Sequence, residues 1–171
     1  STRNEMAALE AMIRPDLGLF TTLGDAHAEG FRSLQEKLEE KLILFKHCPT
    51  IIYNADDAIV DTALQQMYAQ KSLLSWGKSP QSTLFQIVSS TLSQVQTYLT
   101  IKYQNHTYQY VVPFADKASV QNALHCIAVM LTLGMDQPAI QQGLYRIQNI
   151  PMRLELKFGL YNNILVNDTY N

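Results

Sequence analysis

Residues 50–76, TIIYNADDAIVDTALQQMYAQKSLLSW, predict a strand, a helix and a second strand in succession. Thr50–Tyr53 is a short apolar run, and Leu73–Trp76 is another. Between them, Ala58–Gln70 is predicted to be a helix. Alternation of this kind is typical of a parallel α/β sheet.

The alternation extends towards the N-terminus. Glu5–Ile13 predicts a helix, and Leu17–Leu23 predicts a buried strand. Ser33 is a favourable N-cap for a second helix that runs to about Lys46. These elements precede the strand at Thr50, so this half of the chain alternates strands and helices.

The C-terminal half is more varied. Residues 82–112 contain three segments in which apolar and polar residues alternate, which favours an antiparallel sub-sheet with one solvated face. Asp116–Leu133 predicts the strongest helix and Gln137–Gln148 a shorter one. Arg153–Phe158 and Ile164–Val166 predict two further strands, joined by a turn through Gly159 and residues 162–163. The predicted fold is α/β, a Rossmann-like parallel sheet flanked by helices with an added antiparallel sheet.

Length and composition exclude several classes of protein. A chain of 171 residues fits one domain, and its 13 basic residues neither outnumber the 15 acidic ones nor form a run, which argues against a nucleic-acid partner. It has no apolar stretch of about 18–20 residues and no signal peptide, so we expect no membrane partner. Cys48 and Cys126 form no paired motif and are expected to be buried free thiols in the cytoplasm.

Three polar loops follow predicted strands. They comprise residues 25–29, 54–57 and 167–171. In an open parallel sheet the ligand crevice lies at the carboxyl ends of the strands, so all three loops are expected at one edge. The alternative is that these polar residues simply occupy loops.

Lys41 is the most informative single residue. On a helical wheel at about 100° per residue, the side chains of Leu34, Leu38, Leu42 and Phe45 share one face, and Lys41 falls beside its middle. A lysine there extends its amine to solvent, meets a buried partner or loses its proton. A neutral amine is a nucleophile, and it can also react with carbon dioxide to give a carbamate that binds metal.

One loop combines an imidazole with two carboxylates. Asp25, His27 and Glu29 suit a Mg²⁺ or Zn²⁺ site or a general base, and a metal hydrolase is one alternative function that they allow. Gly77-Lys78-Ser79 is not a phosphate-binding P-loop, because Ser72 stands where the first glycine is required.

Five segments can be compared with known motifs in chain order: Met12–Phe31, Ile52–Asp57, Ser119–Leu124, Pro151–Glu155 and Asn167–Asn171. They resemble motifs of the Mur ligase family, and Lys41 stands where that family has a helix lysine. The last segment is similar to "DDSYN", which marks the branch that joins D-alanyl-D-alanine to UDP-N-acetylmuramoyl-tripeptide. Ala26–Phe31 is also similar to the form fused to an alanine racemase.

This resemblance implies that residues 1–171 are the central ATP-binding domain of such a ligase. The expected cofactors are ATP and Mg²⁺, and the expected partners are UDP-N-acetylmuramoyl-peptide and D-alanyl-D-alanine. Because the chain starts without Met and carries no P-loop, we expect truncation at both ends, with the P-loop upstream and a C-terminal domain downstream. The piece alone is then expected to be inactive, and the missing strands leave a sheet edge open to self-association.

The resemblance also assigns roles to single residues. His27 and Lys41 would be the catalytic, Mg²⁺-binding pair, with Lys41 carbamylated. Asn122 would contact the adenine and Arg153 the phosphates of the nucleotide.

Two further assignments and four departures complete the comparison. Asp168 would bind the ribose, and Tyr170 would lie near the base. The positions that differ from the family pattern are Thr22, Ile43, Ser119 and Asn167, and the family has an acidic residue where Ile43 stands. Thr22 and Ile43 favour an alternative function, a degenerate module of the same fold that binds a nucleotide or a partner without turnover.

Overall fold

A computed structural model describes residues 5–23, 31, 33–147, 155–158 and 163–167. The helices are α1 (Glu5–Ile13), α2 (Leu34–Ile43), α3 (Ala58–Tyr68), α4 (Lys117–Thr132) and α5 (Gln137–Arg146). The strands are β1 (Leu17–Phe20), β2 (Thr50–Asn54), β3 (Ser72–Gly77), β4 (Phe85–Leu92), β5 (Thr97–Tyr103), β6 (His106–Val112), β7 (Glu155–Phe158) and β8 (Ile164–Asn167). Among these described helices, none has the length and apolar character needed to span a membrane.

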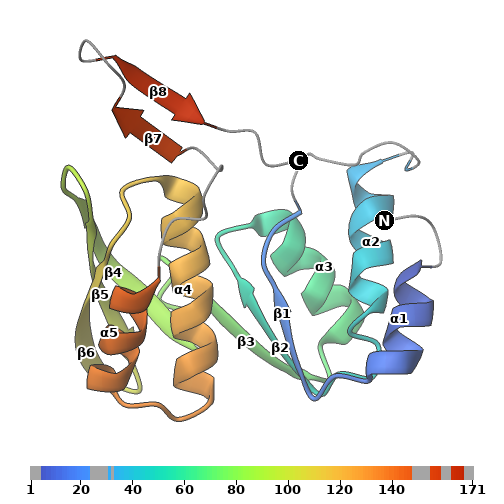
Figure 1. Cartoon of the computed structure of the whole chain (residues 1–171). Helices are drawn as coiled ribbons and strands as arrows, with labels where there is room; N and C mark the ends of the chain where they lie inside the picture. The colour runs from blue at the N-terminus through green and yellow to red at the C-terminus, as the bar shows by residue number, and fades with distance from the viewer. Residues whose placement is uncertain (1–4, 24–30, 32, 148–154, 159–162, 168–171) are drawn as a thin grey trace.

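Six strands form one mixed sheet in the order β1-β2-β3-β4-β5-β6 (Figure 1). Strands β1 to β4 pair in parallel, whereas β4, β5 and β6 pair antiparallel. The parallel join between β3 and β4 is short, linking Trp76 to Phe85 and Gly77 to Gln86. The predicted α/β class is confirmed, and the antiparallel strands continue the parallel sheet instead of forming a separate one.

Helices cover both faces of the parallel strands (Figure 1). In β2, consecutive residues point to opposite faces, and Ile51, Ile52 and Tyr53 are all buried. Ile51 and Tyr53 pack in the cluster formed by α2 and α3, while Ile52 packs in the cluster formed by α4 and α5. Burial on both faces explains why Thr50–Tyr53 shows no alternation of polar and apolar residues.

Helix α1 covers the outer side of α2. The Glu40 carboxylate accepts a hydrogen bond from the Met6 backbone N–H at 3.3 Å. Glu10 is buried and pairs with Nδ1 of His47 at 2.7 Å. Glu40 lies away from the apolar face of α2 and is nevertheless buried, because a second helix packs there.

Lys71, just after α3, holds the end of α2. Its Nζ donates to the carbonyl oxygens of Phe45, Lys46 and Cys48 at 2.8, 2.6 and 2.8 Å. These carbonyls lie in the turns after α2, where the helix dipole favours a cation. The Tyr68 hydroxyl donates to the Leu42 carbonyl at 2.9 Å and adds to this attachment.

Replacing Lys71 by methionine is therefore expected to destabilise the chain by about 1–2 kcal/mol, since three carbonyls lose their donor. The free energy of unfolding in urea measures the effect. Lys46→Met is the matched control, because the side chain of Lys46 is exposed in the same turn. Equal urea midpoints for the two variants would contradict the role given to Lys71.

Strands β7 and β8 pair antiparallel in a two-stranded sheet of their own. The expectation that the last strand belongs to the parallel sheet is therefore wrong. Only residues 159–163 separate the two strands, and a parallel crossover needs about a dozen residues or more. The prediction that residues 167–171 lie at the carboxyl edge of the parallel sheet required β8 to belong to that sheet, and residues 168–171 lie outside the described residues.

Candidate functional site

The carboxyl ends of β1, β2 and β3 lie at one edge of the sheet, because these strands are parallel. Thr21 is the first residue after β1, and Lys78 is the first residue after β3. Asn54 is the last residue of β2, and Ala55–Asp57 follow it. Figure 1 places the first turn of α4 at the same end of the molecule. This edge is the candidate site.

The loop after β2 is built by its own side chains. Asn54 Oδ1 accepts the Asp56 backbone N–H at 2.9 Å, and Asp56 Oδ1 accepts the Lys78 backbone N–H at 2.8 Å. Asp57 caps α3 by accepting the Val60 N–H at 3.2 Å. Each of these three polar side chains has a structural role in the loop. This agrees with the alternative that polar residues at this position simply occupy a loop.

Lys41 is half-buried on α2, with the buried residues Leu38 and Phe45 three and four positions away on the same side. Within the described ranges its side chain has no recorded hydrogen bond or ion pair. Helix α2 runs back from the carboxyl edge of β1, and helical side chains tilt towards the helix N-terminus. Helical geometry therefore predicts that the side chain of Lys41 leans towards the candidate edge.

Asn122 is exposed in the second turn of α4. Helices α2 and α4 pack on opposite faces of the sheet, so the structure does not bring Asn122 into contact with Lys41. The other predicted site residues, His27, Arg153, Asp168 and Tyr170, lie outside the described residues. In the part of the chain that is described, no group of three or more His, Cys, Asp or Glu side chains could hold a metal ion.

His125 was not predicted, and it connects three elements at this edge. Its side chain on α4 is buried, with 2% exposed. Nε2 lies 3.0 Å from the carbonyl oxygen of Thr21, and the ring packs edge-on against Trp76 of β3 with centroids 4.9 Å apart. Because a carbonyl only accepts, Nε2 carries the hydrogen, and Nδ1 is left buried without a partner among the described residues.

Burial lowers the pKa of His125, and the hydrogen bond to Thr21 offsets part of this effect. A folded-state pKa below the unfolded value of about 6.5 means that the unfolded chain takes up the proton first as the pH falls. The contribution of neutral His125 to stability is therefore complete above about pH 6.5 and is lost progressively below it.

We expect His125→Gln to reduce this acid sensitivity. Urea midpoints at about pH 7.5 and about pH 5 measure it, and His106→Gln, at an exposed histidine on β6, is the control. If the wild type and His125→Gln lost the same stability between these pH values, His125 would not be held neutral by the fold.

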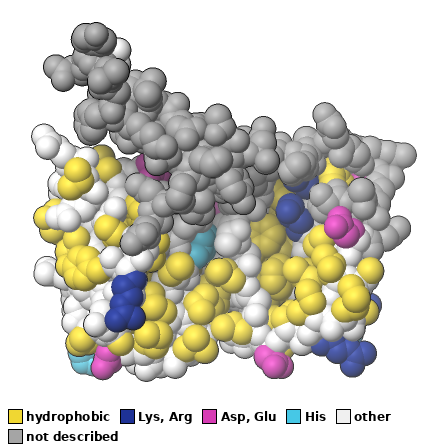
Figure 2. Space-filling model, viewed as in Figure 1, with side chains coloured by type: hydrophobic (Ala, Val, Ile, Leu, Met, Phe, Trp, Pro, Cys, Tyr) yellow, Lys and Arg dark blue, Asp and Glu magenta, His cyan; other side chains and the backbone are white. Residues whose placement is uncertain are grey.

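The described residues show no basic patch on the face seen in Figure 2. Figure 2 shows the Lys and Arg side chains of the described residues lying apart from one another on this face. This distribution agrees with the sequence, which contains no basic run.

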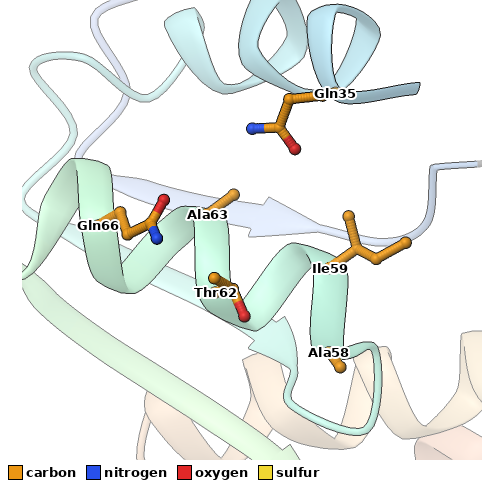
Figure 3. A pocket seen from close by; sticks show the side chains of 6 residues that line it. All are labelled: Gln35, Ala58, Ile59, Thr62, Ala63 and Gln66. Atoms are coloured by element: carbon orange, nitrogen blue, oxygen red, sulfur yellow. The ribbon is translucent and has the colours of Figure 1, made fainter. Parts of the chain in front are cut away.

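A shallow pocket of about 290 Å³ lies elsewhere, between α2 and α3. Gln35 faces it from α2, and the remaining lining residues come from α3 (Figure 3). It contains none of the predicted site residues and therefore does not mark the candidate site.

Comparison with known proteins gives a consistent result. The family model for the Mur ligase middle domain matches residues 1–130. The UDP-N-acetylmuramoyl-tripeptide–D-alanyl-D-alanine ligases of Escherichia coli (strain K12) and Bacillus subtilis (strain 168) are each 26% identical over 174 aligned positions. These alignments cover 99% and 100% of this chain but only 38% and 36% of the relatives.

Two solved structures share the fold. MurF from Acinetobacter baumannii superposes with a TM-score of 0.85 at 20% identity, over 99% of this chain and 37% of that one. The MurF ligase from Thermotoga maritima in complex with ADP gives 0.74 at 21% identity, over 100% of this chain and 39% of that one. The chain thus spans little more than a third of the proteins that it matches.

Proposed function

Because the chain belongs to the Mur ligase family, we propose that it is the central ATP-binding domain of a ligase that joins D-alanyl-D-alanine to UDP-N-acetylmuramoyl-tripeptide. The observation that carries the proposal is the 26% identity to two ligases of this specificity across 99% or more of the chain. The P-loop and the domain that brings the amine would be supplied by other parts of the complete protein. The reaction would take place in the cytoplasm.

The proposed reaction has two steps. A carboxylate oxygen of the tripeptide attacks the γ-phosphorus of ATP, and ADP leaves. The amino group of D-alanyl-D-alanine then attacks the acyl carbon and loses a proton, and phosphate leaves as the amide forms. Bound Mg²⁺ would offset the negative charge of the transferring phosphoryl group.

Lys41 would act as a carbamate. Its neutral amine attacks carbon dioxide and releases a proton, which gives a carboxylate-like group suited to Mg²⁺. Two observations support this role: Lys41 is half-buried and has no partner among the described residues. Helical geometry adds the expectation that its side chain leans towards the carboxyl edge. His27 would be a second ligand on the loop after β1.

The nucleotide would lie along the N-terminal half of α4. The exposed amide of Asn122 offers both a donor and an acceptor, which suits the edge of an adenine ring. By resemblance to the family, Arg153 would reach the phosphates, where a planar cation suits developing charge. Asp168 would bind the ribose and Tyr170 would lie near the base, on the same ground.

ADP release by the complete protein tests the proposal. We expect release that depends on both UDP-N-acetylmuramoyl-tripeptide and D-alanyl-D-alanine. A folded complete protein that binds ATP but releases no ADP would instead support the degenerate module, which Thr22 and Ile43 favour as departures from the family pattern.

A further inference from the structure

The segment that follows β1 accepts a hydrogen bond from another element. β1 ends at Phe20, so the carbonyl of Thr21 lies beyond the β1–β2 ladder. Nε2–H of His125 donates to this carbonyl at 3.0 Å, across 104 positions of sequence. His125 is buried, and a buried N–H without an acceptor is costly, so this contact ties the chain to α4 where it leaves β1.

His125 is itself held in place by packing. It is 2% exposed and lies against Trp76, which is 1% exposed and stacks on Phe85 with ring centroids 5.9 Å apart. This packing holds the imidazole in one position. Its hydrogen bond to Thr21 therefore positions the chain directly after β1.

Two parts of the proposed site meet through this residue. Thr21 begins the segment that reaches His27 six positions later, and Asn122 lies one helical turn before His125 on α4. We infer that His125 is a positioning residue, which holds the start of the metal-binding loop against the helix that contacts the nucleotide. This inference rests on the proposed function.

The surroundings of His125 are neutral. It meets Trp76 from β3 and the Thr21 backbone after β1, and the β2 residue in the same cluster is Ile52. Burial and the Thr21 carbonyl are the only influences recorded on its pKa among the described residues. Its contribution is a directed N–H donor and not a charge, so an amide of similar reach should replace it.

Three variants of the complete ligase test the role. His125→Leu keeps apolar bulk but removes the donor, and we expect the Mg²⁺ concentration for half-maximal turnover to rise about tenfold or more. His125→Gln retains an N–H donor and should stay close to wild type. Cys126→Ser, on the same helix, is the control and should not differ from wild type, because Cys126 is exposed and not buried as its apolar sequence context predicted.

Two results would overturn the role: an unchanged Mg²⁺ requirement in a folded His125→Leu variant, or a rise in His125→Gln as large as in His125→Leu. If His125→Leu does not fold, the test depends on His125→Gln alone. A tenfold rise in the Mg²⁺ requirement of His125→Gln would then overturn the role, whereas a wild-type Mg²⁺ requirement with unchanged thermal stability would support it. If the wild type releases no ADP at all, the proposed function fails, and this role fails with it.

A spectroscopic test of the contact needs no catalysis. Trp76 is the only tryptophan of the 171 residues, so its emission reports on the imidazole that packs against it. At neutral pH, His125→Gln should change the emission of Trp76 in the folded chain, and Cys126→Ser should leave it unchanged. An emission spectrum of folded His125→Gln identical to that of the wild type would show that the imidazole does not hold its place beside β3, whatever the outcome with the ligase.

Discussion

Replacing Lys41 by alanine is expected to lower the turnover of the complete ligase by about 100-fold or more, because the carbamate that would support Mg²⁺ cannot form. Initial rates of ADP release measure the effect. Lys46→Ala, at an exposed lysine in the turn after the same helix, is the matched control and should keep full turnover.

A second substitution separates the carbamate from a simple positive charge. Arginine keeps the cation at position 41 but cannot form a carbamate at neutral pH. We therefore expect Lys41→Arg to be as inactive as Lys41→Ala. A folded Lys41→Arg variant with near wild-type turnover would contradict the carbamate and favour a lysine that acts as a cation.

Gly18→Ala is expected to destabilise the chain by about 2 kcal/mol, which corresponds to a fall in Tm of roughly 5 °C for a chain of this size. A Cβ at Gly18 in β1 would overlap Cδ1 of Phe45 and lie 3.2 Å from Sγ of Cys48. Both neighbours are buried, so the ring cannot move aside without displacing the core. Urea and thermal unfolding measure the loss.

The same substitution at Gly143 is the control. Gly143 lies inside α5, and a Cβ there would meet only Sδ of Met130 at 3.5 Å, an ordinary contact. Alanine favours a helix interior over glycine, so Gly143→Ala should stabilise the chain by about 0.5–1 kcal/mol. Equal changes at both positions would refute the steric reading of Gly18.

Local signals predicted most of the helices and strands. Ser33 caps α2 as expected, accepting the Glu36 N–H at 3.1 Å. Helix α2 ends at Ile43, earlier than the predicted Lys46, because tighter turns with bonds such as Phe45 N–H to the Leu42 carbonyl follow it. A helical wheel does not distinguish such turns from the helix.

Strand pairing depended on contacts that the sequence does not show. The parallel join of Trp76 to Phe85 brings the antiparallel strands into the main sheet, and only two residue pairs make it. The hairpin of β7 and β8 was predicted as two strands but assigned to the wrong kind of sheet. In both cases the partner of a strand is a tertiary property.

The candidate site was only partly predictable. Lys41 could be singled out because a charged residue beside an apolar helix face breaks the expected pattern, and the family motif gave it a role. His125 could not, because the predicted apolar stripe of α4 runs through Leu124 and Ile127, and the buried face is wider. A helix that packs against both a sheet and another helix buries residues on either side of its stripe.

The fate of one oxygen atom tests the proposed ligase chemistry most directly. UDP-N-acetylmuramoyl-tripeptide labelled with ¹⁸O in the reacting carboxylate is turned over by the complete protein with ATP and D-alanyl-D-alanine, and the mass of the released phosphate is measured. An acyl phosphate leaves one labelled carboxylate oxygen in each phosphate, so we expect one ¹⁸O per phosphate released. Unlabelled phosphate formed together with the amide product would contradict the acyl phosphate.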